Sequence, residues 1–373
     1  MVDNLDSNAS GEDIELDHPS PEPDDDQTDS GRPISFWVSL FLGFLLVISA
    51  GLNMLLIIVT ISSAGQFGPS PSARDFQEET LQGSGKDKVL VVPIKGTITD
   101  QSSGGVFGSQ QSPVDKVQTR LDRAVDQEEV KGVIIRVNSP GGGVTASDQI
   151  YHEIKQFKKK RPNVTVLSYM ENVAASGGYY VSAPADYIMA HRTCITGSIG
   201  VLMQFFVVEG LLKKWDVNAV TITPENADKK SIGSPFKQLE PEEREIFQGI
   251  VEKMYEQFVS VTQEGRDQLS REEVLKLADG RIYHAEEAVQ NGLIDQTGYF
   301  DDAVKKVKEM QDLDTAKVVK YKTKRTLFDA FRSTMRSGRS PRLTSRIKRM
   351  LTGEQPPEFL YLWSPRQQIQ INR

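Results

Sequence analysis

The chain has 373 residues, of which 38% are hydrophobic and 25% are charged, and its formal net charge is −7. This composition suits a globular protein of one or two domains. The single cysteine, Cys194, excludes an intramolecular disulfide and is predicted to be a small buried thiol.

Charge is distributed very unevenly along the chain. Every charged residue before Arg32 is acidic, so residues 1–32 are predicted to form a disordered, solvated tail. Near the other end, residues 317–349 hold twelve Lys or Arg and one acid, Asp329. This segment, part of a basic C-terminal region over 313–373, suits either contact with lipid headgroups or a solvated helix on the domain. No nucleic-acid partner is expected.

An uncharged stretch from residue 33 to residue 73 contains the run FWVSLFLGFLLVISAGLNMLLIIVTI. At about 1.5 Å per residue, a helix from Phe36 to Ile61 is about 38 Å long, enough to span the roughly 30 Å hydrocarbon core with tilt. We therefore predict one transmembrane helix over 33–62. The sequence SSAG at 62–65 leaves signal-peptide cleavage open. Arg32 and Arg74 lie on opposite sides of the helix, so the distribution of positive charge does not set its orientation.

Residues 63–87 contain Gly, Ser and Pro without sustained periodicity and are predicted to be a linker. The stretch GSGKD within it is similar to a phosphate-binding loop, but Thr80 stands at the first glycine position. Asp87 stands where a Ser or Thr would meet magnesium. Nucleotide binding is therefore set aside.

From Lys88 onward, β-rich runs alternate with helical patterns. VLVVPIKGTI and KGVIIRVN are separated by a polar helical stretch, and an amphipathic pattern, SDQIYHEIKQFKKK, precedes the strand VTVLSYM. The alternation predicts an α/β fold of βαβ units with a largely parallel sheet, whose functional groups lie where strands end. The turn NSPGGG at 138–143 and Ser176, within ENVAASGGYY, occupy such places.

These two loops together suit acyl transfer. Backbone amides in the glycine-rich turn and after Ser176 can form an oxyanion hole, which contributes about 3 to 4 kcal/mol to a transition state. A purely structural turn is the alternative. A nucleophilic serine also needs a base. The chain has four histidines, and none lies in a sequence context typical of a general base: His18, His152, His191 and His284.

The alternative base is a lysine. Burial must lower the pKa of such a lysine from about 10.4 towards about 7 or 8. The stretch ENADKKSIGSPF supplies Lys229 and Lys230 beside small and apolar residues, and the pattern alone does not choose between them. No His, Cys or Glu cluster has zinc spacing, so no metal site is expected.

Several blocks occur in a characteristic order: GVIIRVNSPGGGV, NVAASGGYYVSAPAD, TGSIGVL, KKSIGSPF, LADGRIYHAEEAVQNGLID and EFLYLW. With these blocks the chain resembles the membrane-anchored serine/lysine peptidases of the signal peptide peptidase A (SppA, protease IV) family, densely over residues 88–300. The resemblance implies a ClpP/crotonase-like fold for a peptidase domain over 88–312.

The resemblance also implies roles for individual residues. Ser176 matches the nucleophile. The family's base stands five residues before a proline, which selects Lys230, before Pro235, over Lys229. Ser198, in TGSIGVL, matches a serine that orients the lysine. The remaining expected positions are the oxyanion amides, which are those of Gly141 and Gly177.

By the same resemblance, we expect an endopeptidase that degrades cleaved signal peptides and other hydrophobic or membrane-associated polypeptides through an acyl-enzyme, without metal or organic cofactor. A single-pass cell-membrane protein with an extracytoplasmic catalytic domain and a ring-like homo-oligomer is implied. The acidic start departs from the family's short basic one. Three alternatives remain: a same-family peptidase that processes specific membrane proteins, a crotonase-like acyl-CoA enzyme, and a non-catalytic membrane scaffold.

Overall fold

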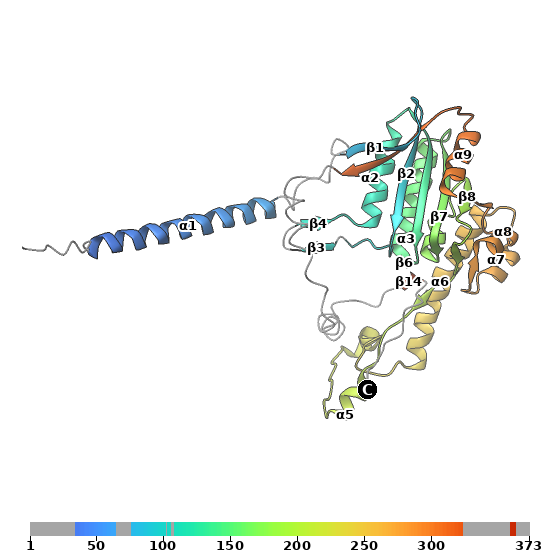
Figure 1. Ribbon diagram of the computed structural model, residues 1–373. Helices are drawn as coiled ribbons and strands as arrows, with labels where there is room; N and C mark the ends of the chain where they lie inside the picture. Colours follow the sequence, from blue (N-terminus) through green and yellow to red (C-terminus); the bar gives the residue numbers. More distant parts are fainter. Residues whose placement is uncertain (1–33, 65–75, 102, 106–107, 324–358, 363–373) are drawn as a thin grey trace, which may run out of the picture. The chain divides into compact units, whose positions relative to one another are not determined.

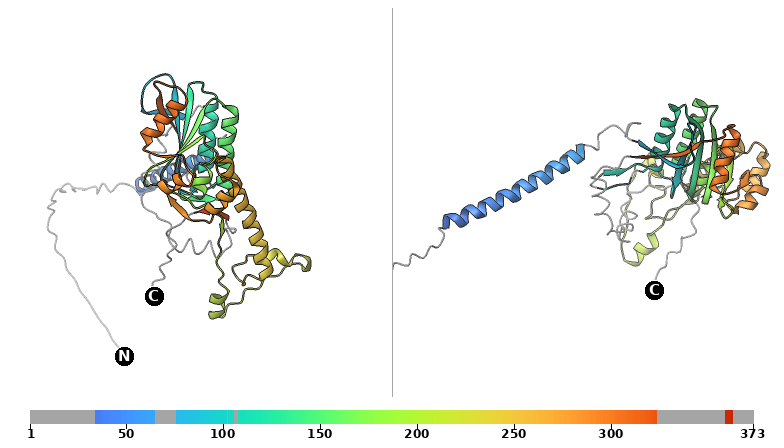
Figure 2. Two further views of the ribbon diagram at one scale, coloured as in Figure 1. Left: turned by 90° about the vertical axis from the view of Figure 1, so that its right-hand side faces the viewer. Right: turned by 45° about the horizontal axis from the view of Figure 1, so that its top comes forward.

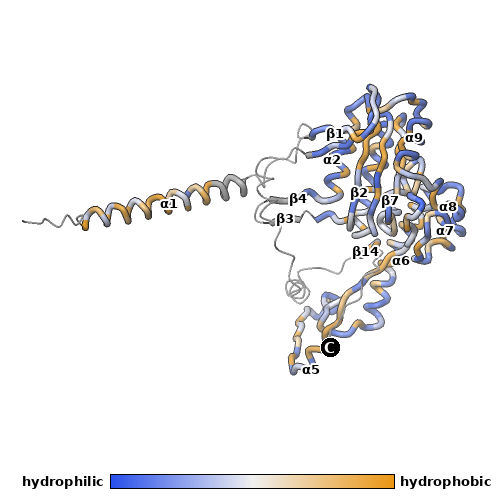
Figure 3. Tube along the Cα trace, viewed as in Figure 1, coloured by the Kyte–Doolittle hydropathy of each residue, from blue (hydrophilic) through white to orange (hydrophobic). Residues whose placement is uncertain are grey.

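The computed structural model describes residues 34–64, 76–101, 103–105, 108–323 and 359–362. The chain divides into two compact units, residues 1–64 and 65–373, and each is considered by itself. The described part of the first is one helix, α1 (Ile34–Ala64), whose residues Ile34–Ile57 are long and apolar enough to cross a membrane. Figure 3 shows apolar residues along this helix. The predicted acidic tail and most of the predicted basic C-terminal region lie outside the described residues.

The second unit is built on a nine-stranded sheet (Figure 1). Its centre is parallel and consists of β2 (Lys88–Lys95), β5 (Val130–Ser139), β7 (Thr165–Ala175) and β8 (Tyr187–Ala190). The other strands extend it at its edges or at the end of β7: β1 (Phe76–Gln82), β13 (Lys317–Thr323), β12 (Gln296–Thr297), β9 (Ile195–Gly197) and β11 (Ile282–His284). The parallel-rich sheet confirms the predicted α/β class.

Helices cover both faces of this sheet. The helices α2 (Pro113–Val125) and α3 (Val144–Lys160) belong to one apolar cluster, and α9 (Phe300–Met310) belongs to another on the opposite face (Figure 2). Successive residues of β2 alternate between the two clusters, as side chains of a strand must. Because both faces are buried, the carboxyl ends of β5 and β7 are held by packed cores.

A second, three-stranded sheet lies at the carboxyl end of β5 and consists of β6 (Gly141–Gly143), β14 (Phe359–Leu362) and β10 (Leu202–Met203). The remaining elements are α4 (Gly177–Tyr180), α6 (Pro241–Gly265), α7 (Arg271–Leu277), α8 (Ala285–Gln290) and the hairpin of β3 (Ser103–Gly105) and β4 (Gly108–Gln110).

Residues 204–240, here called the arm, join β10 to α6. They include α5 (Glu209–Lys214) and the 3₁₀ helix η3 (Glu225–Ser231). The views agree that α5 lies at the end of α6 away from the large sheet (Figures 1 and 2). No residue of the arm is buried within the chain.

The structure differs from the expected domain boundaries at two places. Residues 76–82 were expected in the linker but form β1, and residues 317–323 and 359–362 were expected in a separate basic region but form β13 and β14. The sequence FQEETLQ of β1 lacks an apolar run. It forms a strand because it pairs with β13, where Glu79 lies within ion-pair distance of Lys320 and Lys322.

Candidate active site

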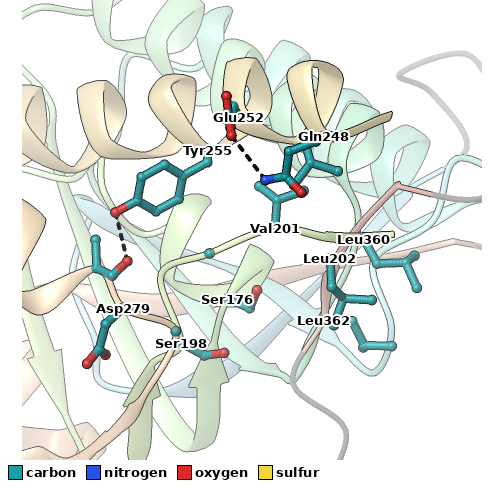
Figure 4. A pocket seen from close by; sticks show the side chains of 14 residues that line it. Ser176, Ser198, Val201, Leu202, Gln248, Glu252, Tyr255, Asp279, Leu360 and Leu362 are labelled. Atoms are coloured by element: carbon teal, nitrogen blue, oxygen red, sulfur yellow. Dashed lines mark hydrogen bonds between the residues drawn. The ribbon is translucent and has the colours of Figure 1, made fainter. Parts of the chain in front are cut away.

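Ser176 lies at the junction of β7 and α4. Its backbone has φ 56° and ψ −118°, a conformation that side-chain-bearing residues rarely adopt and that costs about 1 to 3 kcal/mol. Two hydrogen bonds hold it there: its amide donates to the Gly197 carbonyl at 2.7 Å, and its carbonyl accepts from the Tyr180 amide at 2.9 Å. The turn places Ser176 in the lining of a cavity of about 400 Å³ (Figure 4).

The glycine-rich turn after β5 packs directly against this junction. Gly141 has φ +99°, and a Cβ there would lie 2.7 Å from the Gly177 amide and 2.0 Å from the Tyr361 carbonyl oxygen. Glycine is therefore required by both conformation and space. The structure thus brings the two predicted oxyanion positions, Gly141 and Gly177, side by side at Ser176.

Ser139 clamps the same turn, a role that the sequence reasoning missed. Its hydroxyl donates to the Gly96 carbonyl at 2.6 Å and accepts from the Gly141 amide at 3.1 Å. The amide expected to face an oxyanion is therefore engaged by Ser139. The SPGG motif was the available signal, because a serine two residues before a positive-φ glycine commonly hydrogen bonds to the following backbone.

Around Ser176, the cavity is walled by four parts of the chain (Figure 4). Val251 and Tyr255 come from α6, Leu360 and Leu362 from β14, and the rest of the lining comes from the segments 198–202 and 278–280. The Tyr255 hydroxyl donates to the Ala278 carbonyl at 2.9 Å, which ties α6 to the loop after α7. The lining offers mostly apolar surface around the serine, which suits an apolar side chain.

Ser198 lines the same cavity as Ser176. It follows β9, has φ 50°, and its amide donates to the Arg281 carbonyl at 2.7 Å. Two serines with positive φ therefore line one cavity, whereas the role expected for Ser198, orientation of the lysine, stays a prediction. Backbone strain of this kind often marks functional residues, since packing must maintain it.

The strand β14 runs through the site. It pairs antiparallel with β6, matching Leu362 with Gly141 and Tyr361 with Gly142. The Tyr361 ring is fully buried, stacks on Tyr180 at 5.0 Å between centroids, and its hydroxyl donates to the Met254 carbonyl at 3.0 Å. The short apolar run FLYLW, rich in aromatic residues, was the signal that could have predicted this strand.

Lys230, the predicted base, does not join Ser176 within this chain. It lies in η3 on the arm and is exposed, and none of the residues that line the cavity is a lysine. Its neighbour Lys229 forms ion pairs with Glu242 at 2.7 Å and Asp228 at 3.3 Å. The hydrogen bonds to Glu242 and Asp228 raise the pKa of Lys229, which keeps this lysine charged and unsuited to accept a proton.

None of the histidines in the described part of the chain lines the cavity. His191 contacts Thr193 through Nδ1 at 2.8 Å and packs against Tyr299, and neither His152 nor His284 lines the cavity. His18 lies outside the described residues. Among those residues, no group of three or more His, Cys, Asp or Glu is placed to hold a metal ion.

Comparison with known proteins identifies the class of this chain. Residues 156–314 match the model of peptidase family S49. A candidate signal peptide peptidase SppA of Enterococcus faecium is 37% identical over 257 residues, which cover 69% of this chain and 73% of that protein. Protease 4 of Haemophilus influenzae is 38% identical over 232 residues, 62% of this chain and 36% of that protein. A chloroplastic serine protease SPPA of Arabidopsis thaliana is 29% identical over 237 residues, covering 63% and 34% of the two chains.

A serine with positive φ beside glycine amides, on an α/β sheet, is compatible with a hydrolase, and the family model and these relatives give the class. The chain belongs to the SppA group of peptidase family S49. It is a peptidase. This removes the acyl-CoA enzyme from the alternatives raised by the sequence.

Proposed function

We propose that the chain is a membrane-anchored serine endopeptidase with a ClpP/crotonase-like fold, in which Ser176 is the nucleophile. The observation that carries this proposal is the course of β14, an extended segment hydrogen-bonded along β6 immediately beside Ser176. Because β14 lies between β6 and β10, the substrate backbone in this proposal adds as a strand at the outer edge of β10, whose Leu202 also lines the cavity. Its side chains then point alternately toward the cavity and away from it. Extended substrate binding is what an endopeptidase requires.

In the proposed reaction, the Ser176 hydroxyl loses its proton to Lys230 and attacks the scissile carbonyl carbon. The oxyanion is stabilised by the Gly177 amide and, once it leaves the Ser139 hydroxyl, by the Gly141 amide. The proton passes to the leaving amine, and water then hydrolyses the acyl-enzyme. Ser198 orients the lysine by accepting a hydrogen bond from its ammonium group when the lysine is protonated.

Lys230 reaches Ser176 from a second copy of the chain in this proposal. Within one copy, Lys230 is exposed on the arm and outside the cavity. The arm also exposes large apolar side chains, and the most exposed are Leu211, Trp215, Val217, Val220 and Ile222. Contiguous exposed apolar residues mark an interaction surface. Head-to-tail contacts that insert each arm into the neighbouring site would close into the expected ring.

Mixing two inactive variants tests this arrangement. Ser176→Ala and Lys230→Ala are each expected to lose hydrolysis of a fluorogenic peptide. Co-expressed in equal amounts, they regain about one quarter of wild-type activity, because each of the two required copies is present with a probability of about one half. If the dyad formed within one chain, the mixture would stay inactive.

Lys229→Ala is the matched control for the lysine. It removes a neighbouring ammonium group and the ion pairs with Glu242 and Asp228, so we expect activity within about twofold of wild type. Loss of activity in Lys229→Ala with retention in Lys230→Ala would move the base by one residue. Inactivity of wild type on all peptides would favour the non-catalytic membrane scaffold. The separation of Lys230 from Ser176 within one chain is compatible with that alternative.

The proposed substrates are cleaved signal peptides and other hydrophobic or membrane-associated polypeptides. Support comes from the names of the relatives and from the apolar lining that Leu360 and Leu362 give the cavity. Peptides with Leu or Ala near the scissile bond should be cleaved at least about tenfold faster than those with Asp, because a buried unpaired carboxylate is strongly disfavoured. Equal rates would contradict this assignment. A same-family peptidase that processes particular membrane proteins would instead cleave few members of a peptide library.

The proposed anchor is α1, with the catalytic domain on the extracytoplasmic side. Its span Ile34–Ile57 has a mean hydropathy of 2.4. Alkaline carbonate should leave the full chain in the membrane fraction and release a variant that begins at residue 65. Protease added to intact cells after removal of the outer layers should degrade the domain only if it lies outside the cytoplasm.

A further inference from the structure

A second cleft, which shares no lining residue with the cavity at Ser176, lies at an open edge of the large sheet. Its volume is about 300 Å³, and it is lined by residues of β1, β2, β5, α2 and β13. The strand β13 pairs with β2 only through Lys317–Val319, whereas β2 pairs with β5 as far as Lys95. Among the described residues, β2 therefore has no partner strand on its outer side from residue 91 to residue 95. The cleft occupies this opening.

The charged residues that line the cleft are all basic: Lys95, Lys116, Arg120, Arg136 and Lys320. Three carboxylates lie nearby but outside the lining, and one of them, Asp115, accepts a hydrogen bond from the Ser112 amide at 3.2 Å. Glu171 pairs with Arg136 and lies 3.8 Å from Lys95, and Glu79 lies 3.0 Å from Lys320 and also pairs with Lys322. With Lys322 included, three acids thus lie beside six cations, which leaves the cleft with an excess of positive charge.

Lys116 and Arg120 have no carboxylate within ion-pair distance among the described residues. The Arg120 guanidinium donates to the Lys116 carbonyl at 2.9 Å and to the Tyr321 carbonyl at 3.5 Å, both of which are neutral acceptors. Burial lowers the pKa of Arg120. Burial and the charge of Arg120 lower the pKa of Lys116, and the nearby Asp115 carboxylate offsets this only in part. Two partly desolvated cations that repel each other are stabilised by a bound anion.

We propose that this cleft is a binding site for a phosphate-bearing anion. The planar guanidinium of Arg120 and the ammonium groups of Lys116 and Lys320 supply the donor types that recognise phosphate oxygens. A volume of about 300 Å³ accommodates a phosphate ester rather than only a monatomic ion. The phosphate comes either from a lipid headgroup or from a free phosphorylated compound. The first strand after α1 in the chain, β1, contributes Leu81 to the cleft.

Calorimetric titration of inorganic pyrophosphate into the full chain tests the site. The protein is held in nanodiscs of phosphatidylcholine at about 0.15 M salt, where the Debye length is about 8 Å. Saturable binding of one pyrophosphate per chain is expected. The double variant Lys116→Gln, Lys320→Gln should bind at least about tenfold more weakly. Lys116→Gln alone, which breaks no ion pair among the described residues, should bind several-fold more weakly at an unchanged melting temperature.

The matched control removes two positive charges elsewhere. Lys276 on α7 and Lys305 on α9 are exposed, and Lys276→Gln, Lys305→Gln should keep the affinity within about twofold. Equal weakening in both double variants, or no saturable binding to wild type, would overturn the proposal. A second set of nanodiscs containing phosphatidylglycerol separates the two sources. If the lipid headgroup fills the cleft, pyrophosphate no longer binds wild type there, whereas unchanged binding identifies a free phosphate compound. Neither measurement depends on peptidase activity.

Discussion

The large sheet and the arm differ in the burial of their apolar side chains. In β2, β5 and β7 most side chains are fully buried between two helical layers. On the arm no residue is buried, and Trp215, Val220 and Ile222 expose 75%, 82% and 91% of their surface. The proposed nucleophile, Ser176, lies in the part whose apolar residues are packed within one chain. The proposed base, Lys230, lies in the part whose apolar residues are exposed, so the two groups of the proposed dyad differ in what holds them.

Replacing Ser176 should produce the largest effect. We expect Ser176→Ala to reduce kcat by at least about 10⁴-fold, because loss of the nucleophile removes the covalent pathway. The melting temperature should be unchanged, since alanine keeps the same backbone and volume. Ser260→Ala, which removes a hydroxyl bonded to the Glu256 carbonyl on α6, is the control and should retain full activity. Substantial turnover by Ser176→Ala would show that another group is the nucleophile.

The anchoring of β14 in the core gives the next largest effect. Tyr361→Ala removes a fully buried ring between Tyr180 and Phe258 and should lower the free energy of unfolding by about 3 to 5 kcal/mol. Tyr361→Phe loses only the hydrogen bond to the Met254 carbonyl and should cost about 1 kcal/mol. Denaturant unfolding followed by near-UV circular dichroism measures both. Similar values for the two variants would mean that β14 is not part of the packed core.

Cys194 should make the stability of the sheet domain depend on pH. Burial raises the pKa of its thiol to about 12. The pKa of the thiol in the folded state lies above its value of about 8.5 in the unfolded state. The stability that the buried neutral thiol contributes is therefore fully present below pH 8.5 and is lost as pH rises towards 12. Between pH 8.5 and 10 the unfolding free energy should fall by about 1.5 to 2 kcal/mol. Cys194→Ala should flatten this dependence, and an equal slope in wild type and variant would assign it to other groups.

Local sequence signals predicted the parts of the site that local structure forms. A serine at a strand end, followed by two glycines, indicated the junction at Ser176, and NSPGGG indicated the facing turn. The pairing of β14 with β6 could not be read in the same way, because residues some 220 positions apart meet there and four apolar residues specify no partner. The same holds for β1, whose polar sequence forms a strand only against β13.

The setting of Lys230 was beyond sequence reasoning for a different reason. The sequence places it beside small and apolar residues, which predicted burial, but in one chain the arm leaves it exposed. Apolar neighbours in sequence bury a lysine only when they pack against something, and the arm packs against little of its own chain. Under the proposed arrangement, a second copy of the chain supplies the surroundings that the sequence of one arm does not specify.

The arm itself gives the smallest effect on stability and the sharpest contrast with the sheet. Trp215→Ser should change the unfolding free energy of a subunit by no more than about 0.5 kcal/mol, because 75% of the tryptophan surface is already exposed. It should nevertheless lower the mass of the assembly, measured by analytical ultracentrifugation, and peptidase activity with it. Leu275→Ser, at an exposed position of α7, is the matched control and should change neither. If Trp215→Ser instead destabilised the subunit by several kcal/mol, the arm would be an integral part of the fold. The base would then have to reach Ser176 by movement of the arm within one chain, and the mixed variants would remain inactive.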